Sequence, residues 1–192
     1  MKLSKTFLAL TATLGLAGAA HSAVIVDATI VGNDVVFSGG GTLNTNDLTP
    51  AGAVPADARV TPSLAELTLG NAPGVLPVDL YSGISGWTTF GTINPPTLFT
   101  SGSGGGFGVS GLLQGLFVPA GYTSGDPLSA TNTITGANFD TLGISRGQYV
   151  WTWGSGANAD SFTLNVIPAP LPLALLATGA LIGLGLRKKL KA

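Results

Sequence analysis

The clearest strand pattern in the chain is GQYVWTWGSGANADSFTLNV, residues 147–166. Apolar side chains occupy alternate positions in both halves of this segment: Tyr149, Trp151 and Trp153 in the first, and Phe162, Leu164 and Val166 in the second. Alternation with a period of two is typical of a strand with one buried face. Turn-prone residues fill positions 154–160, so the segment predicts a β-hairpin with a long loop. Because aromatic rings bury large apolar areas, we expect the two tryptophans to lie in the core.

A second hairpin is predicted in AVIVDATIVGNDVVFSGGG, residues 23–41. Its apolar alternation is interrupted by a turn signal at Gly32–Asp34 and resumes at residues 35–38. Further short strands are predicted at Val78–Tyr81, Thr97–Phe99, Phe107–Val109 and Leu112–Val118. Residues 44–78 contain five prolines and little alternation. We therefore expect a long irregular crossing there, with one turn of helix near Leu64–Leu67.

The composition also indicates a fold made of strands and turns. The 192 residues include 29 glycines, and only 9% are charged while 45% are hydrophobic. A glycine-rich, weakly charged chain with short apolar runs favours an all-β domain over a helical one. Many short strands without a fixed repeat predict a β-sandwich of short antiparallel strands over residues 23–165.

Charge is distributed unevenly along the chain. Six of the eight basic residues lie near the two ends: Lys2, Lys5, Arg187, Lys188, Lys189 and Lys191. The segment between them carries Arg59 and Arg146 against all nine acidic residues, a net charge of −7. This acidic body argues against nucleic acid or an anionic membrane surface as its partner.

Residues 1–22, MKLSKTFLALTATLGLAGAAHS, have the three parts of a secretory signal peptide. Two lysines precede the short apolar stretch Phe7–Leu16, and small residues follow it. Ala20 and Ser22 suit a cut before Ala23, although a cut after Ala23 fits nearly as well. The alternative is an N-terminal membrane anchor, which a short apolar stretch interrupted by threonine supports less well.

The segment VIPAPLPLALLATGALIGLGLRKKLKA, residues 166–192, combines prolines, an apolar run and a basic cluster. The run from Leu171 to Leu186 has 16 uncharged residues, which as a helix span about 24 Å, short of the ~30 Å hydrocarbon core. The basic cluster Arg187, Lys188, Lys189 and Lys191 acts as a cytoplasmic stop signal. We therefore predict one C-terminal hydrophobic helix that retains the body on the outer side of the inner membrane.

This layout resembles the PEP-CTERM family of exported bacterial surface proteins. Its proline motif corresponds to Ile167, Pro168, Ala169 and Pro170. Ala169 stands where the commonest form has Glu, so the tail is more similar to the VPLPA-type variant. Residues 121–165 also resemble a body region that recurs in these proteins, and no catalytic activity is associated with that region. The resemblance implies that an exosortase-like membrane enzyme reads the tail, and that the cell surface or an extracellular polysaccharide matrix is the destination.

The residue inventory argues against an enzyme. The one histidine, His21, lies in the predicted signal peptide, cysteine is absent, and residues 23–165 contain no lysine. A serine or threonine nucleophile would lack its usual base, and a histidine-based metal site is excluded. Two facing carboxylates can catalyse glycoside hydrolysis, but Glu66 is the only glutamate and the eight aspartates are scattered. We predict a non-enzymatic protein, with a glycosidase as the less favoured alternative.

Two patterns raise the question of a cofactor. Residues 106–111 fit GxGxxG, but no good helix follows, so we interpret them as a glycine-rich loop. Oxygen-bearing side chains that suit calcium lie in two places, Asn44, Asn46 and Asp47 in one and Asn158 and Asp160 in the other. These residue types are also ordinary turn formers. We predict no cofactor and keep calcium as a weak alternative.

Exposed aromatic residues raise a second functional alternative. Trp87 lies in a Gly/Thr-rich context and is the favoured candidate for stacking on a sugar ring. Tyr122, Trp151 and Trp153 are other aromatic surfaces of this kind, although we expect the two strand tryptophans in the core. A carbohydrate-binding module for matrix polysaccharide is therefore the alternative to a protein defined by its sorting signal alone.

Overall fold

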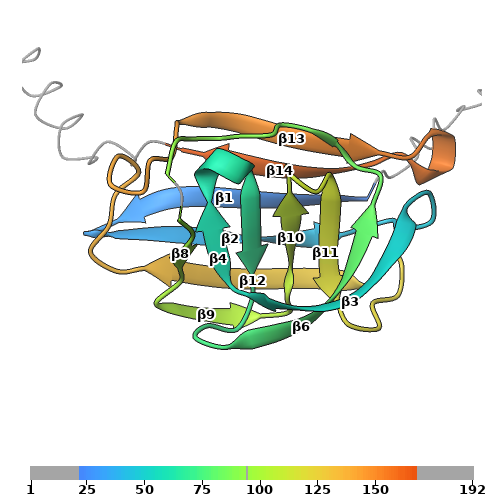
Figure 1. Cartoon of the computed structure of the whole chain (residues 1–192), viewed down its shortest axis with the longest axis horizontal. Helices are drawn as coiled ribbons and strands as arrows, with labels where there is room; N and C mark the ends of the chain where they lie inside the picture. Colours follow the sequence, from blue (N-terminus) through green and yellow to red (C-terminus); the bar gives the residue numbers. More distant parts are fainter. Residues whose placement is uncertain (1–21, 94, 168–192) are drawn as a thin grey trace, which may run out of the picture.

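The computed structural model describes residues 22–93 and 95–167, and these form two β-sheets (Figure 1). The first sheet has the strand order β7 (Ser85–Gly86), β13 (Gly147–Trp153), β14 (Asp160–Val166), β1 (Ala23–Val31), β2 (Asp34–Thr42), β12 (Pro127–Ile134) and β9 (Ser101–Gly104). The second has the order β3 (Thr49–Asp57), β6 (Val75–Ser82), β11 (Gly115–Pro119), β10 (Phe107–Ser110), β5 (Glu66–Leu69), β4 (Arg59–Thr61) and β8 (Thr97–Leu98). This arrangement is consistent with the predicted all-β sandwich.

Both predicted hairpins are confirmed. In the last one, Trp151 pairs with Phe162 and Tyr149 with Leu164, and the connecting loop contains a 3-10 turn, η2 (Gly156–Asn158). In the first, β1 and β2 are antiparallel around a tight turn at Gly32, whose φ of 64° suits glycine. The sequence predicted these two hairpins correctly because the apolar alternation and the turn residues lie close together in the chain.

One strand pair differs from the predicted antiparallel arrangement. β1 lies between β2 and β14, and its pairing with β14 is parallel. Ala23 pairs with Ser161 and Ala28 with Val166, so the chain enters and leaves the body at opposite ends of these strands. At about 3.3 Å per residue, the two ends are roughly 17 Å apart along the strand direction.

The prediction of an irregular crossing over residues 44–78 was also wrong. This segment contains β3, β4, β5 and the start of β6, and its helical turn is the 3-10 turn η1 (Pro62–Leu64). β3 escaped prediction because it is the edge strand of the second sheet and most of its residues are exposed. An exposed edge strand needs no apolar alternation and tolerates proline.

In the GxGxxG segment the predicted short strand at Phe107–Val109 is confirmed, and the interpretation of residues 106–111 as a glycine-rich loop is wrong. Residues 107–110 form β10, which is buried throughout and lies between β11 and β5. A Cβ atom at Gly108 would come within 1.9 Å of the carbonyl oxygen of Leu67. The glycine therefore permits close strand packing, and the chain continues into another strand instead of a nucleotide-binding helix.

The core lies between the two sheets, whose strands run across one another in Figure 1. Phe107 of the second sheet meets Phe162 of the first at a ring distance of 6.5 Å. Asn132 of β12 is fully buried, and its amide bonds both the N–H (2.9 Å) and the carbonyl oxygen (2.8 Å) of Gly70, just after β5. Apolar packing and this polar contact together fix one sheet on the other.

Candidate functional site

Trp87 lies at the edge of the first sheet, immediately after β7. Its side chain is 51% exposed, and with Gly86, Thr88 and Val150 it lines a shallow hollow of about 300 Å³. We call these four residues the Trp87 shelf. Trp151 Nε1 donates a hydrogen bond to the Trp87 carbonyl oxygen at 2.8 Å, and the Tyr149 ring meets the Trp87 ring edge-on at 5.4 Å. The core thus fixes the orientation of an indole that still has one half in solvent.

The other aromatic candidates have structural roles. Trp151 and Trp153 are buried as predicted, and Trp153 Nε1 donates to the Asn44 carbonyl oxygen at 2.7 Å. The Tyr122 hydroxyl accepts from the Leu43 N–H at 3.0 Å and donates to the Asp126 carbonyl oxygen at 2.7 Å. Burial is the main cause that raises the pKa of the Tyr122 phenol. Its neutral hydroxyl joins two loops and is committed to the fold.

The two predicted calcium patterns lie together in space. Asn44 Nδ2 donates to Asn158 Oδ1 at 3.2 Å, and Asn158 Nδ2 donates to Asp47 Oδ1 at 2.6 Å. We call Ser22, Asn44, Asp47, Asn158 and Asp160 the polar cluster. It joins the β2–β3 loop, the β13–β14 loop and the start of β1, three segments that the sequence alone did not bring together.

The two carboxylates of the polar cluster accept hydrogen bonds. Asp47 Oδ2 accepts the Ser155 N–H at 3.1 Å. Asp160 is 6% exposed and accepts the N–H groups of Asn44 (2.5 Å) and Ser161 (2.6 Å) and the hydroxyl of Ser22 (2.7 Å). In the part of the chain that the structure describes, no three acidic or histidine side chains converge as metal ligands do. The cluster joins loops through hydrogen bonds, and calcium stays only the alternative that the sequence left open.

Glu66 belongs to an internal ion pair. Its carboxylate accepts from Arg59 Nη2 at 2.8 Å and from Thr61 Oγ1 at 3.0 Å, so it ties β4 to β5. Its side chain is only 10% exposed. A glycosidase acid must face a second carboxylate across the scissile bond, whereas Glu66 faces an arginine.

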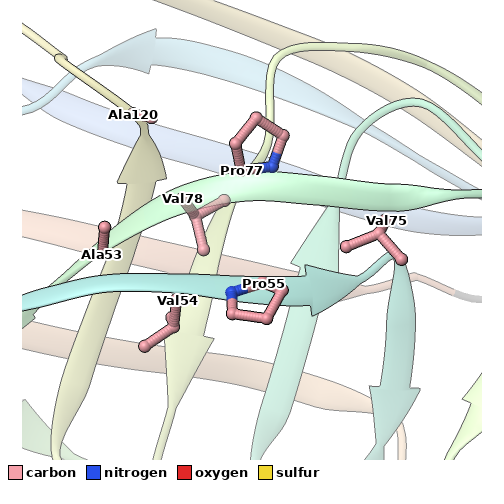
Figure 2. A pocket seen from close by; sticks show the side chains of 7 residues that line it. All are labelled: Ala53, Val54, Pro55, Val75, Pro77, Val78 and Ala120. Carbon is pink, nitrogen blue, oxygen red and sulfur yellow. The ribbon is translucent and has the colours of Figure 1, made fainter.

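An apolar groove that the sequence did not predict lies along β3 and β6 (Figure 2). Its volume is about 440 Å³, and its walls are Ala53, Val54, Pro55, Val75, Pro77, Val78 and Ala120. The proline-rich composition of residues 50–77 was the one available signal. That composition indicates an exposed edge but does not reveal which side chains share it.

The described body ends where the predicted sorting motif begins. The Ile167 N–H donates to the Ala28 carbonyl oxygen at 2.9 Å, and the Ile167 side chain is 39% exposed. The remaining motif residues, the predicted hydrophobic helix and the basic cluster lie outside the described residues, as do residues 1–21 of the predicted signal peptide. Among the residues that the structure describes, none belongs to a helix that is long and apolar enough to cross a bilayer.

Comparison of the chain with protein-family models, with curated proteins and with solved structures gives no match.

Proposed function

We propose that this chain is a non-enzymatic, exported bacterial surface or extracellular-matrix protein. A signal peptide, residues 1–22, directs its β-rich body across the inner membrane. The tail, residues 166–192, then holds the body there until an exosortase-like enzyme processes it at the Pro168–Pro170 motif. The cell surface or a polysaccharide matrix is the destination.

The observation that carries this proposal is the agreement between the ends of the folded body and the ends of the two predicted sorting segments. Within residues 22–93 and 95–167, the first strand begins at Ala23 and the last ends at Val166. These bounds match a signal-peptide cut before Ala23 and a sorting motif that starts at Ile167. A cut before Ala23 and a cut after Ile167 would therefore leave every strand that the structure describes intact.

The absence of an enzymatic role is supported by the side chains that the body offers. Residues 23–165 contain no histidine, cysteine or lysine, and Glu66 is paired with Arg59. General acid–base chemistry at neutral pH normally uses such groups. A binding or structural role does not require these acid–base groups.

Intact-mass measurement on protein from the membrane, surface and medium fractions tests the proposal. We expect the surface form to begin at Ala23 and to end near Pro168–Pro172. Replacement of Pro168 and Pro170 by alanine should leave full-tailed protein in the inner membrane, whereas the control Pro172→Ala should still be processed. A surface fraction made up of protein with the intact tail would contradict the proposal.

The Trp87 shelf supports a second candidate function, the binding of matrix polysaccharide. Its indole is half exposed and held in a fixed orientation, so little side-chain entropy is lost when a flat ligand stacks on it. The net charge of −7 on the body disfavours acidic polymers. Neutral or amino-sugar glycans are therefore the matching chemistry.

Binding of neutral and hexosamine oligosaccharides to the purified protein tests this function. Trp87→Ala should weaken binding by about tenfold or more, as expected for an aromatic residue that carries much of a contact. Trp87→Phe should retain part of the affinity. Leu98→Ala removes another exposed apolar side chain and serves as the matched control. Equal affinity in Trp87→Ala and Leu98→Ala would remove the shelf as a binding site.

A further inference from the structure

We infer that signal-peptide removal creates a new ion pair, in which the α-ammonium group of Ala23 binds the carboxylate of Asp160. This inference rests on the proposed export of the chain and adds a maturation contact to it. The contact would lie at the end of the body opposite to the tail.

The first observation is the place of Ser22. It is the last residue of the predicted signal peptide, and its hydroxyl donates to Asp160 Oδ2 at 2.7 Å. The α-nitrogen of Ala23 is four covalent bonds from that hydroxyl oxygen, which corresponds to roughly 3–5 Å. The nitrogen that the cut would release therefore lies within about 8 Å of Asp160 Oδ2 before the cut is made, near enough for the new N-terminus to reach the carboxylate.

The second observation is that hydrogen bonds already hold the Asp160 carboxylate in place. Its side chain is 6% exposed, and the backbone N–H groups of Asn44 and Ser161 donate to it. Ser22, Ala23, Ala159, Asp160 and Ser161 line a small apolar-walled hollow of about 250 Å³. Low exposure strengthens a charge-assisted hydrogen bond when the charge has a partner.

The chemistry of the cut supplies the cation. Hydrolysis of the Ser22–Ala23 peptide bond gives the carboxylate to Ser22 and an amino group to Ala23. With an ordinary pKa of about 7.7–8.0, that amino group takes up a proton at neutral pH. The leader leaves with the Ser22 hydroxyl, and a charged N–H donor takes the place of a neutral O–H donor at Asp160 Oδ2.

The strand pairing also favours one of the two signal-peptide cuts that the sequence allows, the cut after Ser22. A cut after Ser22 preserves the pairing of Ala23 with Ser161. A cut after Ala23 would remove that pair and leave the new amine on Val24, which pairs with Phe162, one residue farther from Asp160. The ion pair therefore requires a mature chain that begins at Ala23.

Other titratable groups lie near Asp160, and their charges also affect how the ion pair depends on pH. Asp47 of the β2–β3 loop belongs to the same cluster. Tyr122 and Asp126 follow β11, and the charge of Asp160 contributes to the raised pKa of Tyr122. These groups are neutral or negative, so they favour a cation at the new N-terminus.

The α-amino pKa of the exported full chain is the quantity to measure. Its body lacks lysine, so acetylation followed by mass spectrometry distinguishes the N-terminal amine from the tail lysines. We expect acetylation of the Ala23 amine at pH 7 to be about tenfold slower than that of an ordinary α-amine, equivalent to a pKa raised by about one unit. Asp160→Asn should restore the ordinary rate, and Asp47→Asn should not.

Stability gives a second readout that does not depend on the Asp160 variant folding. A raised folded-state pKa means that the ion pair contributes fully below the unfolded value near 8 and is lost as pH rises through the folded value. Acetylation of the wild-type N-terminus should therefore lower Tm at pH 7 more than at pH 10.

Each outcome has a distinct meaning. An Ala23 N-terminus with an ordinary acetylation rate would overturn the ion pair and leave export intact, and so would a mature chain that begins at Val24. A surface protein that retains its leader would overturn both the ion pair and the proposed export.

Discussion

Asn132 is a polar side chain in the middle of the core, and it contacts the backbone of the opposite sheet. Its amide forms hydrogen bonds with both the N–H and the carbonyl oxygen of Gly70. Gly102 provides the space for this amide, because a Cβ atom at Gly102 would come within 2.0 Å of Asn132 Nδ2. A buried amide with all its partners specifies one arrangement of the two layers. The sequence pattern could not reveal that Asn132 joins the two sheets, since an asparagine in a Ser/Thr-rich segment is typical of a turn.

We expect Asn132→Ala to lower the free energy of unfolding by about 3 kcal/mol, because it leaves the N–H and carbonyl of Gly70 buried without partners. Denaturant unfolding of the purified protein measures this loss. Thr131→Ala, on the exposed face of the same strand, should change stability by only about 0.5 kcal/mol. Similar losses in the two variants would show that Asn132 does not join the sheets.

At the scale of elements, β3 shows how the second sheet ends. Pro55 of β3 lies opposite Pro77 of β6, and neither has an N–H to donate. In an antiparallel pair without mutual hydrogen bonds, the backbone groups point away from the partner. Pro55 therefore removes a donor from the open edge, and the irregular pairing between Pro50 and Gly52 distorts that edge further. Both features protect a sheet from pairing with another chain.

Replacement of Pro50 and Pro55 by threonine should promote association through this edge, because it restores N–H donors and β-branched side chains. Light scattering over a range of protein concentrations should show dimers or larger species that the wild type does not form. Ala53→Thr adds a similar side chain to the same strand without adding an N–H, and it should stay like the wild type. Association of the Ala53→Thr control to the same extent would assign the effect to side chains.

The elements that the sequence predicted correctly are those whose signals are local. The β1–β2 and β13–β14 hairpins each carry their alternation and their turn within about 20 residues. β12 was missed because alanine and asparagine occupy two of its buried positions, so its alternation is weak. The parallel pairing of β1 with β14 and the assembly of the polar cluster join residues more than 100 positions apart. No local pattern encodes such contacts.

At the scale of the whole molecule, the two proposed sorting segments join the described body at opposite ends of the β1–β14 pair. Ser22 belongs to the polar cluster, and Ile167 lies beside Ala28 at the other end. If the proposed tail crosses the inner membrane, the polar cluster faces away from it. The signal peptidase and the exosortase-like enzyme would then act at ends that do not obstruct each other.

Replacement of Arg187, Lys188, Lys189 and Lys191 by glutamine should release the body from the inner membrane with its tail uncut. The apolar run is short for a span, so we expect its retention to depend on the cytoplasmic charges. Cell fractionation with intact-mass measurement tests this. Replacement of the three lysines by arginine keeps the charge and should preserve retention. Release of the arginine variant, or full retention of the glutamine variant, would contradict a role for charge.

The parallel pairing of β1 with β14 also determines how the protein bears mechanical load. A pull on the tail acts along β14, which is hydrogen-bonded to β13 on one side and to β1 on the other. Because these bonds lie across the strand direction, the force shears many of them together and does not open them one at a time. A body tethered at Val166 would therefore resist drag from the medium through a strand that is held on both sides.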